Sequence, residues 1–174
     1  MNAMMIIPLN GLPAGKTRFS WQAGKEFFAE FDNSDILDAD LSVEAIVEKS
    51  GTYLGVDLRL GGSVTVQCDR CLEDLEIEVD ELVPLTVKFG DEPDGAESSE
   101  NGREIIYLQG EPESIDLSQT VYDYACLAVP MHHVHEDGSC NPEAMKYLSQ
   151  ESGESQEHGT DNNPFAALKG LFDN

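Results

Sequence analysis

The sequence has few basic residues and no long apolar run, and both shortages exclude classes of protein. Ten Lys and Arg stand against 34 Asp and Glu, a formal net charge of −24 that repels nucleic-acid phosphates. No apolar run approaches the ~18 residues of a membrane helix, so we expect no membrane partner. Residues 1–8 lack the basic region of a signal peptide, which predicts a soluble, cytoplasmic protein.

The motifs of common enzyme classes are also missing. The chain has no glycine-rich phosphate loop, no Gly-x-Ser-x-Gly and no His-Glu-x-x-His. Carboxylates are so numerous that no pair stands out as an acid and its base. We therefore expect a protein that acts by binding and is not an enzyme.

Strand-like alternation of apolar and polar residues fills the middle of the chain. It is visible at 43–47, 54–60, 64–68 and 75–89, with a further apolar run at 105–108. We expect Gly61-Gly62 to turn between two strands of a hairpin, and Pro84 to mark an edge or a bulge. Consecutive strands without helices between them predict an α+β fold with an antiparallel β-sheet, either open or barrel-like.

One main helix is predicted at 116–129, covering one face of this sheet. Asp116 and Gln119 have the spacing of a capping box, and Pro130 ends the helical pattern. The apolar residues of the segment share one helical face: Leu117, Val121, Tyr124, Ala125 and Ala128. Residues 91–103 are polar and acidic, which predicts a mobile acidic loop within a single α+β domain of residues 1–148.

The C-terminal residues predict an acidic linker, 149–163, followed by a short apolar helix, 164–172. Asn163 fits a helix N-cap with Pro164 at the first helical position. Phe165 and Leu168 then share a stripe. A helix this short is marginal alone, so it should form only against another surface, either its own domain or a groove on a partner.

Cysteine and histidine residues form the clearest candidate site. Cys68 and Cys71 make a Cys-x2-Cys turn at the end of a predicted strand, and His135 and Cys140 offer a second pair. Such a turn presents two thiolates to one tetrahedral zinc ion, which two further ligands would complete. His132 and His133 leave the choice of histidine open, and a reduced dithiol without metal remains an alternative. Cys126 falls within the predicted helix and is expected to be a small apolar residue.

Four segments, taken in order, resemble one protein family. They are Cys68-Asp-Arg-Cys71-Leu72, Leu127-Ala-Val-Pro130, His135 to Cys140, and Asn163-Pro164-Phe165-Ala-Ala-Leu168. Together they resemble the bacterial large ribosomal RNA subunit accumulation protein family, YceD. The resemblance implies a role in the accumulation of 23S ribosomal RNA and in large-subunit biogenesis, without enzymatic activity. It implies a large-subunit precursor or a ribosomal protein as partner, with 23S rRNA itself as a further candidate.

The charge of the chain bears on how such a partner would be bound. Lys16, Arg18 and Lys25 lie within residues 1–25, which contain no acid, and cations beside Phe19 and Trp21 suit RNA. The alternative is a strand with the two aromatic rings in the core and the cations in solvent. A basic protein partner fits the acidic surface better. The competing function is a zinc-dependent or thiol-redox protein that uses the Cys68–Cys71 pair.

Overall fold

Long strands dominate the fold. The structure, a computed structural model, describes residues 4–31, 35–91, 99–110 and 112–151. Its elements, in chain order, are β1 (Ile6–Pro8), β2 (Gly15–Gly24), α1 (Lys25–Phe28), β3 (Asp38–Ser50), β4 (Tyr53–Gln67), β5 (Asp74–Phe89), β6 (Ser99–Glu100), β7 (Arg103–Leu108), β8 (Ser114–Asp116), α2 (Ser118–Ala128) and α3 (Pro142–Glu151).

The main sheet contains six strands in the order β2-β3-β4-β5-β7-β6, and a small second sheet pairs β1 with β8. Every neighbouring pair is antiparallel except β5 and β7, which run parallel over Leu85–Phe89. The mainly antiparallel sheet is thus confirmed, whereas a purely antiparallel one is wrong. Parallel neighbours need a connection of about a dozen residues, and segment 90–102 has that length. Across the described residues the sheet stays open, with β2 and β6 at its edges, so it is not a barrel.

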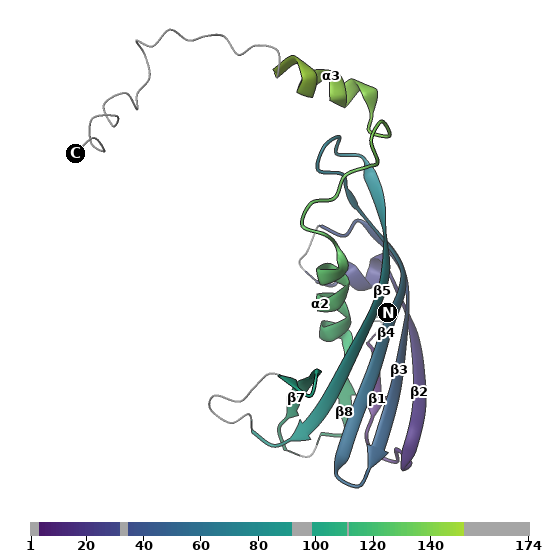
Figure 1. The fold of residues 1–174 in the computed structure, drawn as a ribbon. Coiled ribbons are helices and arrows are strands. Elements are labelled where there is room, and N and C mark those ends of the chain that lie inside the picture. Colours follow the sequence, from purple (N-terminus) through teal and green to yellow (C-terminus); the bar gives the residue numbers. More distant parts are fainter. Residues whose placement is uncertain (1–3, 32–34, 92–98, 111, 152–174) are drawn as a thin grey trace, which may run out of the picture.

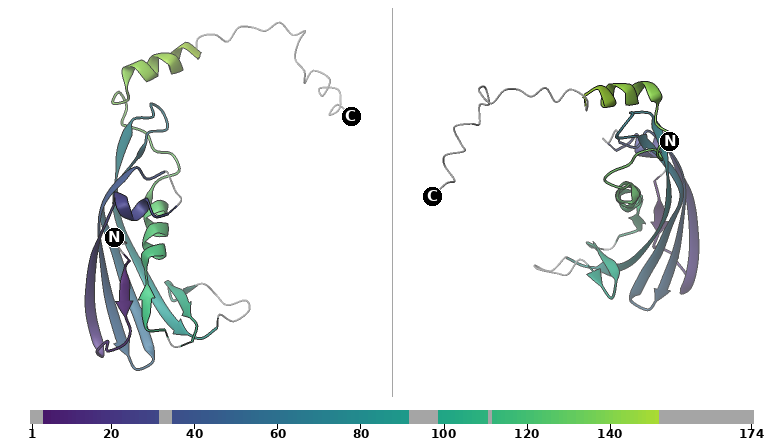
Figure 2. Two further views of the ribbon diagram at one scale, coloured as in Figure 1. Left: turned by 180° about the vertical axis from the view of Figure 1, so that it is seen from behind. Right: turned by 45° about the horizontal axis from the view of Figure 1, so that its top comes forward.

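Helices α1 and α2 and the small sheet cover the concave side of the main sheet, and α3 lies beyond one end (Figures 1 and 2). The strands bury alternate residues toward these helices, as Val43, Leu60 and Val83 show. No polar or charged side chain of the described residues is buried in this core. The described residues contain three helices, and α3 is nearly as long as α2. The prediction of a single main helix is therefore not confirmed.

Helix α2 packs as predicted but begins later. Leu117, Val121 and Ala125 are fully buried against the sheet. The predicted capping box is wrong, because Asp116 pairs with Ile6 as the last residue of β8 and Leu117 occupies the N-cap. The Asp116 carboxylate accepts a hydrogen bond from the Ser118 N–H at 2.9 Å.

The Gly61-Gly62 turn is the clearest error of the sequence analysis, because both glycines lie inside the continuous strand β4. The ladder to β3 runs through them without a break, pairing Gly62 with Leu41. A Cβ atom at Gly62 would collide with the Asp40 carbonyl oxygen. The backbone φ of Gly62 is +143°, a value that residues with side chains rarely adopt. The glycine therefore permits a close approach of β3 to β4 and not a chain reversal.

The remaining predicted segments are described in part. Within 91–103, Ser99–Glu100 form β6 and Arg103 begins β7, whereas 92–98 lie outside the described residues. Residues 149–151 of the predicted linker end α3, and 152–172 lie outside the described residues. The division into domain, linker and terminal helix therefore stays a prediction. No helix within the described residues is long and apolar enough to cross a membrane.

Candidate metal centre

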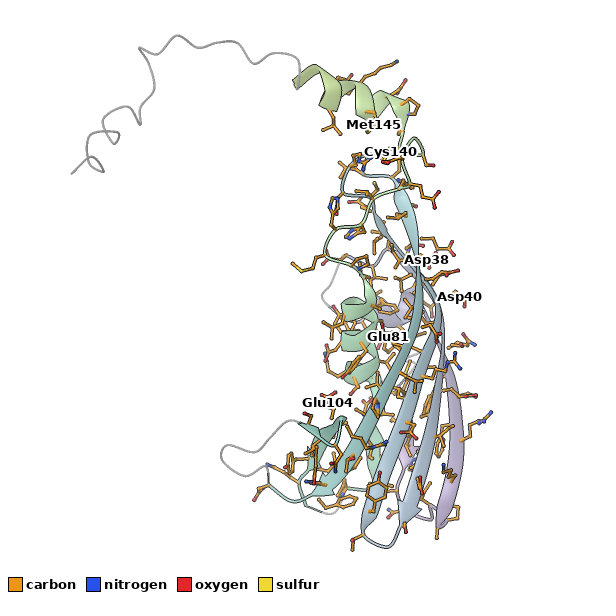
Figure 3. All side chains as sticks on the ribbon, viewed as in Figure 1. Asp38, Asp40, Glu81, Glu104, Cys140 and Met145 are labelled. Carbon is orange, nitrogen blue, oxygen red and sulfur yellow. The ribbon has the colours of Figure 1, made fainter. Side chains whose placement is uncertain are left out.

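The tip of the long β4–β5 hairpin carries the Cys-x2-Cys motif. The turn is closed by hydrogen bonds from the Cys68 N–H to the Glu73 carbonyl at 2.8 Å and from the Leu72 N–H to the Cys68 carbonyl at 2.9 Å. Leu72 adopts the left-handed backbone conformation, with φ 61°, which reverses the chain directly after Cys71. The sequence thus places both thiols on one tight turn. Figure 3 shows Cys140 at this end of the sheet, close to α3.

The segment between α2 and α3 brings the other two ligands to this tip. The ligand atoms of Cys68, Cys71, His135 and Cys140 all lie within 4.8 Å of one another. The sulfurs of Cys68 and Cys140 are 4.0 Å apart, and the Cys71 sulfur is 3.4 Å from the His135 Nδ1. Tetrahedral zinc, with bonds of about 2.3 Å to sulfur and 2.0 Å to nitrogen, separates its ligand atoms by about 3.8 and 3.5 Å. The predicted convergence of the four residues is confirmed, and the set can hold a metal ion.

The hydrogen bonds of His135 prepare its ring to bind a metal. Its Nε2 lies 3.1 Å from the Asp74 carbonyl oxygen, which can only accept, so this nitrogen carries the proton. The lone pair is then on Nδ1, which faces the Cys71 sulfur. A backbone carbonyl that fixes the tautomer of a ligating histidine is a common feature of zinc sites.

His132 and His133 serve a different role. The two rings approach the carboxylate of Asp69, at 3.2 Å for His132 Nδ1 and 3.5 Å for His133 Nε2. The backbone of His133 donates to the same carboxylate at 2.8 Å, and its Nδ1 lies 2.9 Å from the Pro130 carbonyl oxygen. The structure thereby resolves which histidine joins the cluster: of the three, His135 does.

Backbone groups favour the thiolate at Cys68. Burial raises the pKa of this thiol, but the N–H groups of Cys71, His135 and Arg70 outweigh burial and lower the pKa to about 5. The Arg70 N–H donates to the Cys68 sulfur at 3.4 Å. A hydrogen bond with Cys68 in turn raises the pKa of His135. The lowered pKa favours the thiolate at Cys68, which is the form that binds a metal.

The other two thiols differ from each other. Backbone N–H groups of Asn141 and Glu73 lower the pKa of Cys71, whereas burial, reinforced by the neighbouring sulfurs, raises the pKa of Cys140. A bound cation would offset the cost of ionising Cys140, because it supplies a positive charge directly at the sulfur. The chemistry of the donor set therefore suits a soft divalent cation such as zinc.

A small apolar cluster around the sulfurs connects the centre to α3. Leu75, Val134, Ala144 and Met145 pack against the three cysteines, and Leu75 also packs against the main core. Asn141 begins α3, since its side-chain oxygen accepts from the Glu143 N–H at 2.9 Å. These contacts make the centre the link between the hairpin tip and α3.

A search against protein-family models decides the relationship of the chain. Residues 56–172, more than half of the chain, match the family described as large ribosomal RNA subunit accumulation protein YceD. The chain belongs to this family. The match spans all four residues of the centre, together with α2 and α3. No curated protein and no solved structure matches the chain.

The remaining residues singled out from the YceD resemblance and from charge lie elsewhere. Lys16 and Arg18 project from β2 and form ion pairs with Glu48 and Glu44 of β3, at 3.8 and 3.3 Å. Lys25 is exposed at the start of α1. Asn163, Pro164, Phe165 and Leu168 lie outside the described residues. A role in partner or RNA binding for these seven residues stays a prediction.

Sequence reasoning did not find helix α3 and the residues that support the centre. Asn141 before Pro142 is a helix-start signal of the same kind as Asn163 before Pro164, and it marks α3. The Asp74 carbonyl that orients His135 leaves no sequence signal, because any residue supplies a carbonyl. Cys126 agrees with its interpretation as a small apolar residue, half-buried in α2 and packed against the core.

Proposed function

We propose that this YceD family member is a non-catalytic binding factor that supports 23S rRNA accumulation during large-subunit biogenesis. The observation that carries the proposal is the family match over residues 56–172, whose description concerns accumulation of the large ribosomal RNA subunit. The cluster of Cys68, Cys71, His135 and Cys140 holds a structural zinc ion in this proposal. Four protein ligands fill a tetrahedral zinc and leave no position for a substrate, which is the pattern of structural sites.

The partner in this proposal is a large-subunit precursor, reached through a basic ribosomal protein in the cytoplasm. A net charge of −24 favours encounters with cationic proteins and opposes contact with RNA phosphates. Lys16 and Arg18 support this preference, because glutamates of β3 already neutralise both side chains. Direct contact with 23S rRNA through these cations and Lys25 is the less favoured route.

The zinc gives the C-terminal segment a fixed starting point in this proposal. Cys140 lies immediately before α3, so a metal bound to it holds the helix at the hairpin tip. Residues 149–163 then act as a linker, and Asn163, Pro164, Phe165 and Leu168 form a short helix that inserts into a groove on the partner. A tethered helix gains affinity from the raised local concentration that its linker provides.

Affinity purification of the tagged full chain from its native cells tests the function. We expect large-subunit precursors, quantified by their 23S rRNA, to co-purify with the wild type. Deletion of residues 164–174 should abolish this association while leaving the melting temperature unchanged. If no precursor co-purifies with the wild type, the proposal is refuted; a large drop in melting temperature after the deletion would contradict the helix's role in the partner's groove.

The thiol-redox alternative is tested on the same purified protein. Structural zinc predicts firmly bound metal and unreactive thiols at Cys68 and Cys71, whereas a redox site predicts rapid and reversible oxidation of this pair. Metal analysis combined with thiol titration separates the two.

A further inference from the structure

A hollow beside α2 gathers carboxylates from separate elements. We call it the acidic notch; it has a volume of about 570 Å³ and is lined by Glu104 of β7 and by Thr120, Asp123, Tyr124, Cys126 and Leu127 of α2. Four of these positions, 120, 123, 124 and 127, follow the three-to-four-residue spacing of one helical stripe. This stripe borders the buried stripe of α2, because Tyr124 also packs against the core. Figure 3 shows Glu104 at the concave side of the sheet, together with Glu81 of β5.

The notch is negative, and its charge is not neutralised within the described part of the chain. The Tyr124 hydroxyl donates to the Glu104 carboxylate at 2.7 Å. This hydrogen bond, burial, and the negative charges of Glu104 and Glu81 raise the pKa of Tyr124 to about 12. The neighbouring Arg103 directs its guanidinium elsewhere, to the Asp57 carboxylate at 2.8 Å. No ion pair joins Glu81, Glu104 or Asp123 to a described Lys or Arg.

Apolar surface adjoins these carboxylates. Leu127 lines the notch and is 75% exposed, an unusual degree for a leucine on a helix that packs against a core. The aliphatic side chain lies one helical turn beyond Asp123. A ligand that fits the notch therefore combines positive charge with an apolar group.

Three other occupants fit less well. A single metal ion does not fit, because among the described residues only the cysteine–histidine cluster brings three or more ligand atoms together. RNA phosphates are repelled by the carboxylates. The chain's own residues 152–174 carry four acids against Lys169, so the notch repels most of this segment.

We infer that the acidic notch docks a lysine- or arginine-bearing segment of a protein partner, with an apolar side chain of that segment against Leu127. The inference rests on the proposed function and deepens it, because it names the surface that receives the basic partner. Carboxylates on α2 and β7 can each meet a separate cationic side chain, and Leu127 provides the apolar contact that anchors a segment.

Fluorescence anisotropy tests the notch with the zinc-loaded full chain and a short labelled peptide in which arginines flank a central leucine. The double variant Glu104→Gln, Asp123→Asn should bind the peptide about fivefold more weakly, since two exposed ion pairs contribute roughly 0.5 kcal/mol each. Leu127→Ser should weaken binding as well.

The matched control Asp40→Asn, Glu78→Gln removes the same charge from the opposite face of the sheet. Both carboxylates are exposed there, and both residues pair in register with Ser63. It should change affinity less than twofold.

Equal weakening by the notch and control variants would overturn the inference, since binding would then follow net charge alone. Tighter binding of a polyuridine RNA than of the peptide, competing at the notch, would also overturn it. So would tighter peptide binding after deletion of residues 152–174, which would make the chain's own segment the occupant. Affinity purification from native cells separates the two proposals. If the notch variant still retains the precursor, the docking role of the notch is refuted and the proposed function stands. If the wild type retains no precursor, the proposed function itself is refuted.

Discussion

Removal of the proposed zinc ion should release the end of the molecule around α3 without unfolding the sheet. The three buried cysteines form a cluster of their own, which meets the main core at Leu75, so we expect most of the core packing to persist without the metal. The segment that would open runs from Val129, where α2 ends, through Cys140 to α3. Zinc bound as proposed would join Cys140 to Cys68 and Cys71 and so close this segment, since these ligand atoms already lie within 4.8 Å of one another.

The size of the effect follows from the length of the closed segment. Eleven positions separate Val129 from Cys140, and a cross-link that closes a loop of this size contributes about 3 kcal/mol in the chain-entropy description. A zinc chelator should therefore lower the free energy of local opening by about this amount. Amide exchange in the segment should then accelerate roughly 100-fold, because 1.4 kcal/mol corresponds to a factor of ten.

Hydrogen exchange resolved by residue provides the assay. The reporter amides are His133, bonded to the Asp69 carboxylate, and Met145, bonded to the Asn141 carbonyl. The Val121 amide, bonded to the Leu117 carbonyl within α2, serves as the internal control and should exchange at an unchanged rate. Unchanged exchange at the reporters after chelation would refute the metal link, and equal acceleration at Val121 would refute the separation of the two cores.

Three further predictions follow from individual side chains. Cys71→Ser should abolish zinc binding and lower stability, whereas Cys126→Ser, outside the cluster, should retain one zinc per chain by metal analysis. Gly62→Ala should lower the free energy of unfolding in urea by about 2–4 kcal/mol, because the added Cβ would meet the Asp40 carbonyl oxygen. The control Gly61→Ala should lower it by less than about 1 kcal/mol, because no atom lies nearer than 3.8 Å to the added Cβ. The raised pKa of Tyr124 gives a stabilisation that is complete below pH ~10 and is lost as pH rises through about 12. Ultraviolet titration should therefore show a late ionisation phase in the folded wild type that is missing from Tyr124→Phe. Absence of this phase from the wild type would contradict the hydrogen bond to Glu104.

The strands were predictable because alternation is a local property. Burial of one face of a strand requires an apolar residue at every second position, and the sequence shows this pattern directly. The same pattern argued against the Gly61-Gly62 turn. In a two-residue hairpin Leu60 and Ser63 would share a face, yet Leu60 and Val64 share one, as a continuous strand requires.

The sequence by itself determined the residue types of the candidate metal centre and the family of the chain. Cys68 and Cys71 lie on one turn, so their proximity is a consequence of spacing alone. Only the tertiary structure decided that Cys140, 72 positions beyond Cys68, meets them, and that His135 and not its neighbours does so. The physical reason is that this meeting depends on where α2 ends on the sheet. The Asp74 carbonyl orients His135, and the Asp69 carboxylate holds His132 and His133. Both groups act through space and not along the chain.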